Sequence, residues 1–141
     1  MNEFNILVTG ANGQLGSELE ALHGHYVYNF CFAGRDTLDI TNLDAIKNYI
    51  KDKDINVIIN CAAYTAVDKA ESEKELAFEI NADGVKNLAF ASKENDIKLV
   101  HISTDYVFNG ENFKPYVESD KTAPKGVYGE SKLKGENEMI A

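Results

Sequence analysis

The stretch Val8-Thr9-Gly10-Ala11-Asn12-Gly13-Gln14-Leu15-Gly16 indicates the fold more clearly than any other part of this chain. Its glycines, Gly10, Gly13 and Gly16, are spaced as G-x-x-G-x-x-G between an apolar run and a helical pattern. In a strand–turn–helix unit the first glycine allows a tight turn, the second lets the backbone approach a pyrophosphate, and the third lets helix and strand pack closely. Backbone N–H groups at the helix N-terminus then bind the phosphates. The stretch therefore predicts a nucleotide site, with a plain loop as the alternative.

Short apolar runs alternate with helical patterns along the rest of the chain. We expect strands at residues 4–8, 26–33, 57–61 and 97–103, and helices at residues 14–22, from 41, from 72 to 95 and from 128 onward. The runs Thr41–Asp44 and Ser72–Glu75 resemble capping signals at two of these helix starts. Because no tight hairpin joins the strands, the pattern predicts an α/β fold: a Rossmann-like, doubly wound parallel sheet with its first strand near the centre.

The alternation stops early for a fold of this class. A dinucleotide-binding sheet usually has about six strands, and only four are predicted here. We therefore expect the sheet to be truncated before its last strands, as the front part of something larger. The irregular connection at residues 105–127 is long enough that a functional role is expected for it.

Composition and charge argue against several classes of protein. A length of 141 residues suits one domain, and 44% hydrophobic residues are enough for one core. The net charge of −9 argues against a nucleic-acid partner, which would need a positive face. No apolar stretch is long enough to cross a bilayer and the N-terminus has no signal-peptide pattern, so we expect a cytoplasmic protein with no membrane partner.

The cysteines and histidines predict no metal site. Cys31 and Cys61 are far apart and form no CxxC motif, so buried free thiols in a reducing compartment are expected. His23, His25 and His101 do not fit a metal-binding pattern. His101 lies in a strand-like run and is expected to be structural.

The residues after the second predicted strand are placed to read the adenosine part of a nucleotide. Arg35 can pair with a 2′-phosphate, which favours NADPH, whereas an acid at this position would favour the free 2′-hydroxyl of NADH. The neighbouring Asp36 keeps NADH open, and a surface arginine in a turn is the other interpretation. Asp39 and Ile40 either border the adenine or lead into the helix at Thr41.

An acid and a cation are paired near the end of the chain, in Tyr128-Gly129-Glu130-Ser131-Lys132. Residues four apart project from one face of a helix. A lysine ammonium beside a phenol favours the phenolate, so such a tyrosine can give a proton to a carbonyl oxygen during reduction by a nicotinamide. By themselves the two residues could equally be a pair on a helix surface.

Several motifs in register resemble one known family. The turn at residues 8–16 resembles that of extended short-chain dehydrogenases/reductases. The runs Asn60-Cys61-Ala62-Ala63-Tyr64-Thr65-Ala66-Val67-Asp68-Lys69-Ala70-Glu71 and Ser103-Thr104-Asp105-Tyr106-Val107-Phe108 resemble the dTDP-4-dehydrorhamnose reductase family within that group. Pro115-Tyr116-Val117-Glu118 and the Tyr128–Lys132 motif continue the match in the same order, so the resemblance covers essentially the whole chain.

The resemblance implies a reaction and a role for each matching residue. The family reduces the C4 ketone of dTDP-4-dehydro-6-deoxy-L-mannose with a nicotinamide hydride, giving dTDP-L-rhamnose. Tyr128 would be the general acid, Lys132 would bind the nicotinamide ribose, and Thr104 would hydrogen-bond the reacting oxygen. Asp105 would hold the sugar, and Val67 would border it or only lead into the long helix. With the residues above, the predicted cofactor-binding set is Gly10, Asn12, Gly13, Gln14, Leu15, Gly16, Arg35, Asp39, Ile40, Ala62, Ala63, Tyr64, Thr65, Ser103, Tyr128 and Lys132.

The resemblance also implies what this chain lacks. Family members continue into further strands and a smaller domain that binds the dTDP-sugar. Residues 1–141 would then be an incomplete NAD(P)-binding Rossmann domain that binds NADPH, or NADH, better than it turns over the sugar. The strand at residues 97–103 would have an open edge. Some members use Mg²⁺, which this sequence does not support, and a homodimer is compatible with the family.

Two other functions remain open at this level. One is a nucleotide-sugar epimerase or dehydratase that recycles bound NAD, against which Arg35 and the run at residues 103–108 argue. The other is a non-catalytic, NADP-binding regulatory subunit that resembles the beta subunit of methionine adenosyltransferase.

Overall fold

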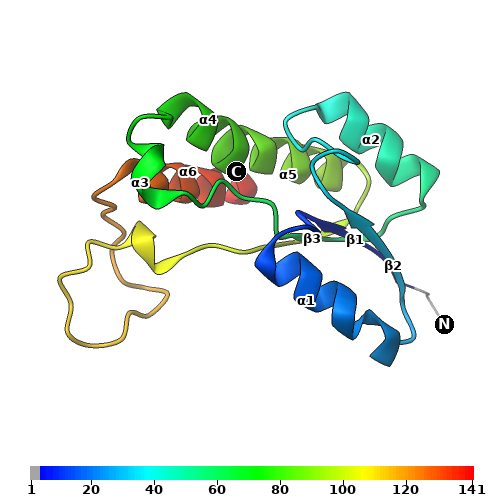
Figure 1. Cartoon of the computed structure of the whole chain (residues 1–141), viewed down its shortest axis with the longest axis horizontal. Coiled ribbons are helices and arrows are strands. Elements are labelled where there is room, and N and C mark those ends of the chain that lie inside the picture. Colours follow the sequence, from blue (N-terminus) through cyan, green and yellow to red (C-terminus); the bar gives the residue numbers. More distant parts are fainter. Residues whose placement is uncertain (1–3) are drawn as a thin grey trace.

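Four parallel strands form one sheet in the computed structural model, which describes residues 4–141 (Figure 1). The strands are β1 (Asn5–Thr9), β2 (Asn29–Ala33), β3 (Val57–Asn60) and β4 (Lys98–His101), in the order β2-β1-β3-β4. In the register of the sheet Leu7 lies opposite Cys31 on one side and Ile58 on the other, and Ile58 lies opposite Leu99. The predicted parallel sheet with a central first strand is therefore confirmed.

The core explains why the strands read as apolar runs. Parallel strands are covered on both faces, so they carry few polar residues. Leu7 and Ile58 are fully buried, and they pack with Ile46 and Leu88 from the helices. β2 is shorter than predicted because residues 26–28 form a bend that follows the 3₁₀ turn η1 (His23–His25), and the Tyr26 amide closes this turn on the carbonyl of His23.

Helices cover the two faces of the sheet unequally (Figure 1). The helix α1 (Gln14–Leu22) lies on one face, and α2 (Leu43–Asp52), α5 (Gly84–Glu94) and α6 (Val127–Ile140) lie on the other. Right-handed crossovers produce this arrangement, because the connection from β1 to β2 runs the opposite way across the sheet from the later ones. An ion pair of 2.7 Å between Lys47 and Glu94 joins α2 to α5 on their solvent side.

Two predicted helix starts are wrong in detail. At α2 the cap is Asn42, whose side chain accepts from the Ala45 amide, because the Thr41 hydroxyl donates instead to Asp39 at 2.8 Å. The capping box at residues 72–75 does not form, because the Ser72 hydroxyl donates to the carbonyl of Lys69 and so closes the preceding turn. In both cases the hydroxyl is turned toward a nearby acceptor, to which it donates, and does not accept from an amide of the first turn.

The long helix predicted for residues 72–95 is one continuous run with an irregular middle. It consists of α4 (Lys74–Phe78), the π-helical segment η2 (Glu79–Asp83) and α5, and it follows the short α3 (Val67–Ala70). Single π-helical turns inside α-helices are frequent at functional sites. This one carries Asn81, which is 1% exposed and bonds outside its own helix.

The connection between β4 and α6 is irregular, as predicted, apart from the 3₁₀ turn η3 (Asp105–Val107). It projects from the body as a loop (Figure 1) and is held by stacked rings of Phe108 and Tyr116, whose centroids are 4.3 Å apart. β4 pairs with β3 alone, so within residues 4–141 it is an edge strand. None of the helices in this described part combines the length and apolar character needed to span a membrane.

Candidate cofactor and catalytic site

The glycine-rich turn at the end of β1 has a geometry that other residues could not adopt. Gly10 has φ of +65°, and a Cβ atom there would lie 2.5 Å from the backbone nitrogen of Ala62. The Gly13 amide donates to the Gly10 carbonyl at 2.9 Å, which closes the turn before α1. A Cβ atom at Gly16 would clash with the same carbonyl and with Ala11, so this glycine lets α1 pack on the turn. The spacing predicted the tight turn at Gly10 and the close packing at Gly16, and the approach of a pyrophosphate to Gly13 stays a prediction.

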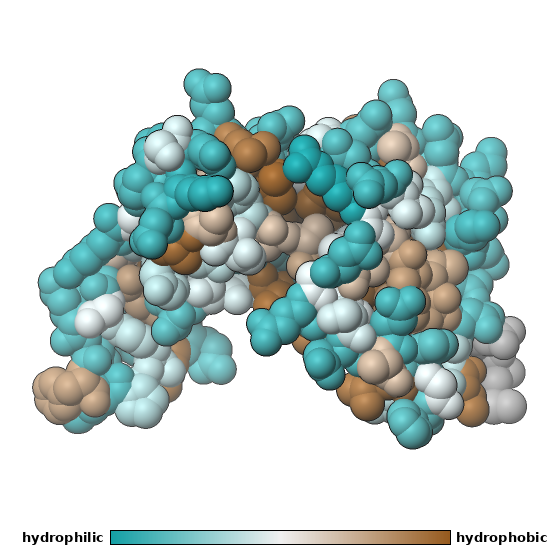
Figure 2. Space-filling model, viewed as in Figure 1, coloured by the Kyte–Doolittle hydropathy of each residue, from teal (hydrophilic) through white to brown (hydrophobic). Residues whose placement is uncertain are grey.

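A cleft of about 450 Å³ opens where β1, β2 and β3 end. Ten of the predicted cofactor residues line it: Gly10, Asn12, Gly13, Arg35, Asp39, Ile40, Ala62, Ala63, Tyr64 and Thr65. The space-filling view shows the molecule hollowed between the part built on the long loop and the part built on α1 (Figure 2). The carboxyl ends of parallel strands are where ligands bind in open α/β sheets.

The cleft has further lining residues that were not predicted as part of the cofactor site. They are Gly34, Leu38, Thr41, Cys61, Ala66 and Ile80. Gly34 and Cys61 directly follow strands, so their positions were a usable signal. Leu38 and Ile80 gave none, because the fold brings their distant segments to the cleft. Burial raises the pKa of the Cys61 thiol, which keeps this half-buried cysteine in its neutral form.

Asp39, whose carboxylate interacts with the charge of Arg35, already accepts two hydrogen bonds. The Oδ1 atom of Asp39 accepts from the Thr41 amide at 2.9 Å and from the Thr41 hydroxyl at 2.8 Å. These hydrogen bonds, the backbone one first, hold the pKa of Asp39 below its usual value, and the charge of Arg35 adds to the effect. Ile40 is 5% exposed. Asp39 therefore leads into α2 and also lines the cleft, and its place beside an adenine stays a prediction.

A polar network joins three strands below the cleft. The Thr9 hydroxyl donates to Oδ1 of Asn60 at 2.6 Å, and the Ala62 amide donates to the same oxygen at 3.1 Å. Since this oxygen accepts, the Asn60 amide nitrogen donates to Nδ1 of His101, 3.0 Å away. Asn60 is 1% exposed. The network fixes the loop that begins at Ala62 relative to the sheet.

The loop after β3 is also held from the helix side. Asn81 accepts from the Tyr64 amide at 2.8 Å and donates to the Tyr64 carbonyl at 3.0 Å, while its amide also donates to the hydroxyl of Ser131. The Tyr64 hydroxyl donates to Glu73, and this bond raises the pKa of Tyr64 to about 12. Asn81 thereby connects the cofactor cleft to α6, which carries the predicted catalytic pair.

Tyr128 lies in a second depression, of about 490 Å³. Asp105 and Val67, the two residues predicted to border the sugar, line it together with Tyr128. The rings of Tyr106 and Tyr128 meet edge to face with centroids 5.4 Å apart. Consecutive residues line the two depressions, since Ala66 lines the cleft and Val67 lines the Tyr128 pocket.

Lys132 is buried rather than presented to the cleft. It is 2% exposed, and its ammonium donates to the Ile102 carbonyl at 2.6 Å. Burial lowers the pKa of Lys132, and the nearby carboxylate of Glu136 opposes that shift. Glu136 also accepts a hydrogen bond from the Ser103 hydroxyl.

The predicted residues thus fall into groups, and not all of them border the cleft. The cleft lining does not include Gln14, Leu15, Gly16, Ser103, Tyr128 or Lys132. Thr104 caps η3 by accepting from the Tyr106 amide, and with Asp105 it lines a further hollow beside Glu136. Within residues 4–141 no cluster of His, Cys, Asp and Glu side chains is arranged to hold a metal ion.

Comparison with known proteins adds a family to this geometry. A protein-family model described as RmlD substrate binding domain matches residues 4–141. A dTDP-4-dehydrorhamnose reductase of Mycobacterium tuberculosis is 43% identical over 140 residues, which cover 96% of this chain and 45% of the relative. The protein of that name from Escherichia coli is 41% identical, covering 96% of this chain and 46% of the relative.

Solved structures that resemble this chain carry the same name as these relatives. A dTDP-4-dehydrorhamnose reductase of Bacillus anthracis, in complex with NADP, is 42% identical with a TM-score of 0.94, covering 98% of this chain and 49% of that one. A protein of the same name from Clostridium acetobutylicum is 46% identical with a TM-score of 0.94, covering 97% of this chain and 49% of that one.

These matches confirm the predicted family resemblance and the Rossmann-like fold. The chain spans about half the length of the relatives it matches. Because the family model covers every residue that the structure describes, the chain belongs to the family of the RmlD substrate binding domain.

Proposed function

We propose that the protein to which these residues belong is a cytoplasmic oxidoreductase that reduces the C4 ketone of dTDP-4-dehydro-6-deoxy-L-mannose to dTDP-L-rhamnose with NADPH. In this proposal the chain supplies the cofactor site together with Thr104, Tyr128 and Lys132. The observation that carries it is that consecutive residues, Ala66 and Val67, line two depressions, one built on the glycine turn and the other on Tyr128.

The cleft fits a dinucleotide in size and in chemistry. Its volume of about 450 Å³ is in the range of small-molecule sites. The glycine turn offers backbone N–H groups at the start of α1 with no side chains in the way, as a pyrophosphate requires. Arg35 is the one arginine of the sequence and lines the cleft, which favours the 2′-phosphate of NADPH over NADH.

The chemistry assigned to the protein is proton transfer and orientation. A bound nicotinamide would supply a hydride to the C4 carbon, and the electron pair of the carbonyl double bond would move to its oxygen. That oxygen would take a proton from the Tyr128 hydroxyl while the Thr104 hydroxyl hydrogen-bonds it. Lys132 would favour the phenolate left behind. An ammonium has three donors, so the bond from Lys132 to Ile102 leaves two for ribose hydroxyls.

Titration of this chain with NADPH, and in parallel with NADH, tests the cofactor part of the proposal. We expect saturable binding that is tighter for NADPH, measured by calorimetry. Gly13→Val should abolish it, because a Cβ at position 13 would already lie 3.2 Å from the Gly10 carbonyl and would face the pyrophosphate. Gly24→Val is the matched control, since a Cβ there meets no atom within 4 Å. Absence of binding by a folded sample would contradict the proposal.

A second assay tests the reaction itself. Consumption of NADPH in the presence of the dTDP-linked 4-ketosugar, with dTDP-rhamnose as the product, would support the assignment. Binding of NADPH without any turnover, by a protein that includes the substrate-binding part of the family, would instead favour a non-catalytic NADP-binding module.

A further inference from the structure

The helix that carries Tyr128 begins without a capping residue of its own. The N-cap position of α6 is Gly126, which has no side chain to accept from the first amides of the helix. The next closing bond, from the Glu130 amide to the Gly126 carbonyl at 2.9 Å, already belongs to the regular pattern of the helix. The start of the helix borders the Tyr128 pocket, because Gly126, Tyr128 and Gly129 all line it.

A carboxylate from a distant segment takes the place of the missing cap. Glu71, the last residue of the Asn60–Glu71 run and the residue after α3, accepts from the Val127 amide at 2.9 Å, although 56 residues separate the two. A Cβ atom on Gly126 would lie 3.0 Å from the same carboxylate oxygen. The glycine therefore leaves the space through which Glu71 reaches the helix. A negative charge at a helix N-terminus is also favoured by the helix dipole.

The same turn of α6 is fixed on its other side. A Cβ atom on Gly129 would clash with the backbone carbonyl of Tyr106, so α6 lies directly against η3 at this point. The Tyr106 ring meets the Tyr128 ring edge to face. Two contacts therefore fix the turn that carries Tyr128. The close approach of Gly129 to the Tyr106 carbonyl would be broken by a rotation of α6, and the bond from Val127 to Glu71 sets where the helix begins.

We propose that Glu71 is a positioning residue for Tyr128, which acts by capping α6 from outside the helix. This inference rests on the proposed function, in which Tyr128 is the proton donor. The carboxylate lines the same pocket as the phenol, so direct contact with the sugar is the rival role for Glu71. The two roles differ in what they predict for the free protein: capping changes α6 without any ligand, and sugar binding does not.

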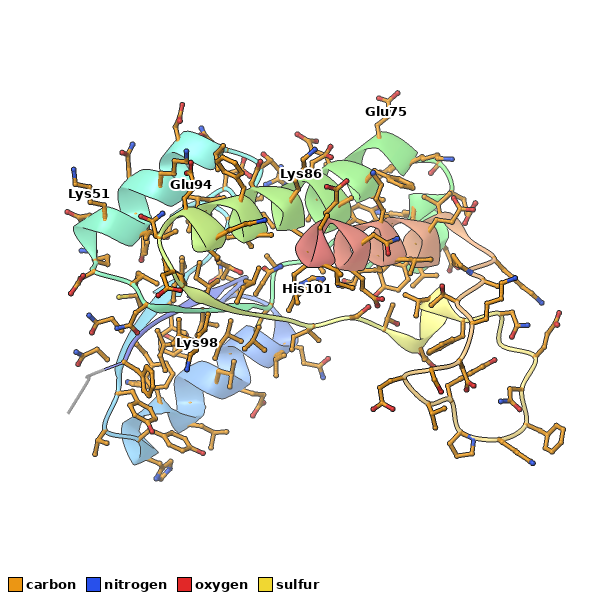
Figure 3. All side chains as sticks on the ribbon, turned by 180° about the vertical axis from the view of Figure 1, so that it is seen from behind. Lys51, Glu75, Lys86, Glu94, Lys98 and His101 are labelled. Atoms are coloured by element: carbon orange, nitrogen blue, oxygen red, sulfur yellow. The ribbon has the colours of Figure 1, made fainter. Side chains whose placement is uncertain are left out.

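Four variants of the 141-residue chain separate the effect of the Glu71 acceptor oxygen from the effect of its charge. Glu71→Ala removes the acceptor, and Glu71→Gln keeps an acceptor oxygen without the charge. The double variant Glu71→Ala, Gly126→Ser supplies a local cap in the space that the carboxylate leaves, since position 126 has the extended backbone that N-cap residues adopt. Glu75→Ala is the control, because Glu75 points away from the body at the start of α4 (Figure 3).

Amide hydrogen exchange and tyrosine ring resonances, both measured by NMR without ligand, are the readouts. In Glu71→Ala we expect the Val127 amide to exchange about five-fold faster, the change that follows from losing a typical helix cap. The Tyr128 ring resonances should shift because its contact with Tyr106 changes. Glu71→Gln keeps an acceptor for the Val127 amide, so both readouts should stay near the wild type. An N-cap serine accepts from the second or third amide of a helix, so the Gly126→Ser double variant should restore the Tyr128 ring resonances but not the Val127 exchange rate. Glu75→Ala should alter neither readout.

The outcomes that overturn the inference differ from those that overturn the proposed function. An unchanged Val127 exchange rate in Glu71→Ala, or a Tyr128 ring that does not move when exchange accelerates, would show that Glu71 does not position Tyr128. If the resonances behave as expected and turnover is measurable, Glu71→Ala should lower kcat several-fold with NADPH affinity unchanged, and Gly126→Ser should recover it. Loss of sugar affinity alone, with α6 unaltered, would assign Glu71 to substrate binding instead.

Discussion

The side-chain amide of Asn60 donates to Nδ1 of His101 across β3 and β4, over 3.0 Å. Because Nδ1 accepts, the imidazole is neutral with its proton on Nε2, and Nε2 is buried with no partner among residues 4–141. Figure 3 shows His101 at the end of β4, beneath α6. Burial, and then the charge of Lys132, lower the pKa of His101 to about 4 from an ordinary value of 6.5. The structural role predicted for this histidine therefore depends on its neutral form.

His101 should make the stability of the fold depend on pH. Below pH 6.5 the unfolded chain takes up a proton that the folded chain excludes until about pH 4. The contribution is therefore fully present above pH 6.5 and is lost as the pH falls toward 4. After allowance for the partial exposure of the ring, we expect a loss of about 1–2 kcal/mol in the free energy of unfolding.

Urea unfolding at pH 7 and pH 4.5 measures this loss, and His101→Gln is the comparison. The variant should lose less stability than the wild type over this interval. Carboxylates such as Asp39, whose pKa values are lowered, lose stability in the same direction, but they do so in both proteins and cancel. An equal pH dependence in the two proteins would show that His101 does not titrate with folding.

Arg35→Asp should change the preferred cofactor. The arginine lines the cleft, where its charge can pair with a 2′-phosphate. Loss of such a charge-assisted pair and its replacement by a like charge should weaken NADPH binding about ten- to a hundred-fold, with NADH affected much less. Calorimetry with both cofactors gives the ratio, and Arg35→Lys, which keeps the charge, should lie between the two. An unchanged ratio would leave Arg35 as a surface residue.

Most of the fold could be predicted because local and global signals agree. Apolar runs predicted the strands. The turn from Gly10 to Gly16 predicted the first crossover, because its close backbone contacts leave little room for residues other than glycine. The errors lie where a neighbouring acceptor takes the hydroxyl that was expected to cap the helix. Nothing local to Thr41 shows that Asp39 will take its hydroxyl and leave the cap to Asn42.

The site was predictable where it follows a strand and unpredictable where it depends on distant segments. Ala62 and Ala63 border the cleft because β3 ends before them, and position along the chain is enough to show it. The contacts of Asn81 with Tyr64 and of Glu71 with Val127 join residues 17 and 56 apart. They arise from how the helices pack, which periodicity does not reveal.

Tyr128→Phe should remove most turnover and leave NADPH affinity nearly unchanged. The hydroxyl is the proposed proton donor, and Tyr128 does not line the cofactor cleft. General acid catalysis is worth about 10²–10⁴-fold, so kcat should fall by that order. Tyr106→Phe is the matched control, because it removes a hydroxyl but keeps the ring that meets Tyr128. Wild-type turnover in Tyr128→Phe would exclude this residue as the acid.

Gly135→Ala should destabilise the packing of α6 on η2. A Cβ atom at this position would clash with the backbone carbonyl of Asn81, and a backbone atom can yield only if the helix shifts. Overpacking of this kind costs about 1–3 kcal/mol in the free energy of unfolding. Gly24→Ala should be nearly neutral, because a Cβ there meets nothing within 4 Å. Equal urea midpoints for the two variants would contradict the close approach of α6 to Asn81.

Val100→Lys should reduce self-association of this chain. Within residues 4–141 β4 pairs with β3 alone, and Val100 on it is 49% exposed, so a strand edge and an apolar side chain are available together. Natural sheets protect such edges with charged residues, lysine above all. We expect the variant to stay monomeric at concentrations where the wild type forms larger species in analytical ultracentrifugation. Val27→Lys makes the same change in charge at a residue that is 90% exposed and outside any strand, so it should not reduce self-association. An equal effect of both variants would assign the improvement to net charge rather than to the edge of β4.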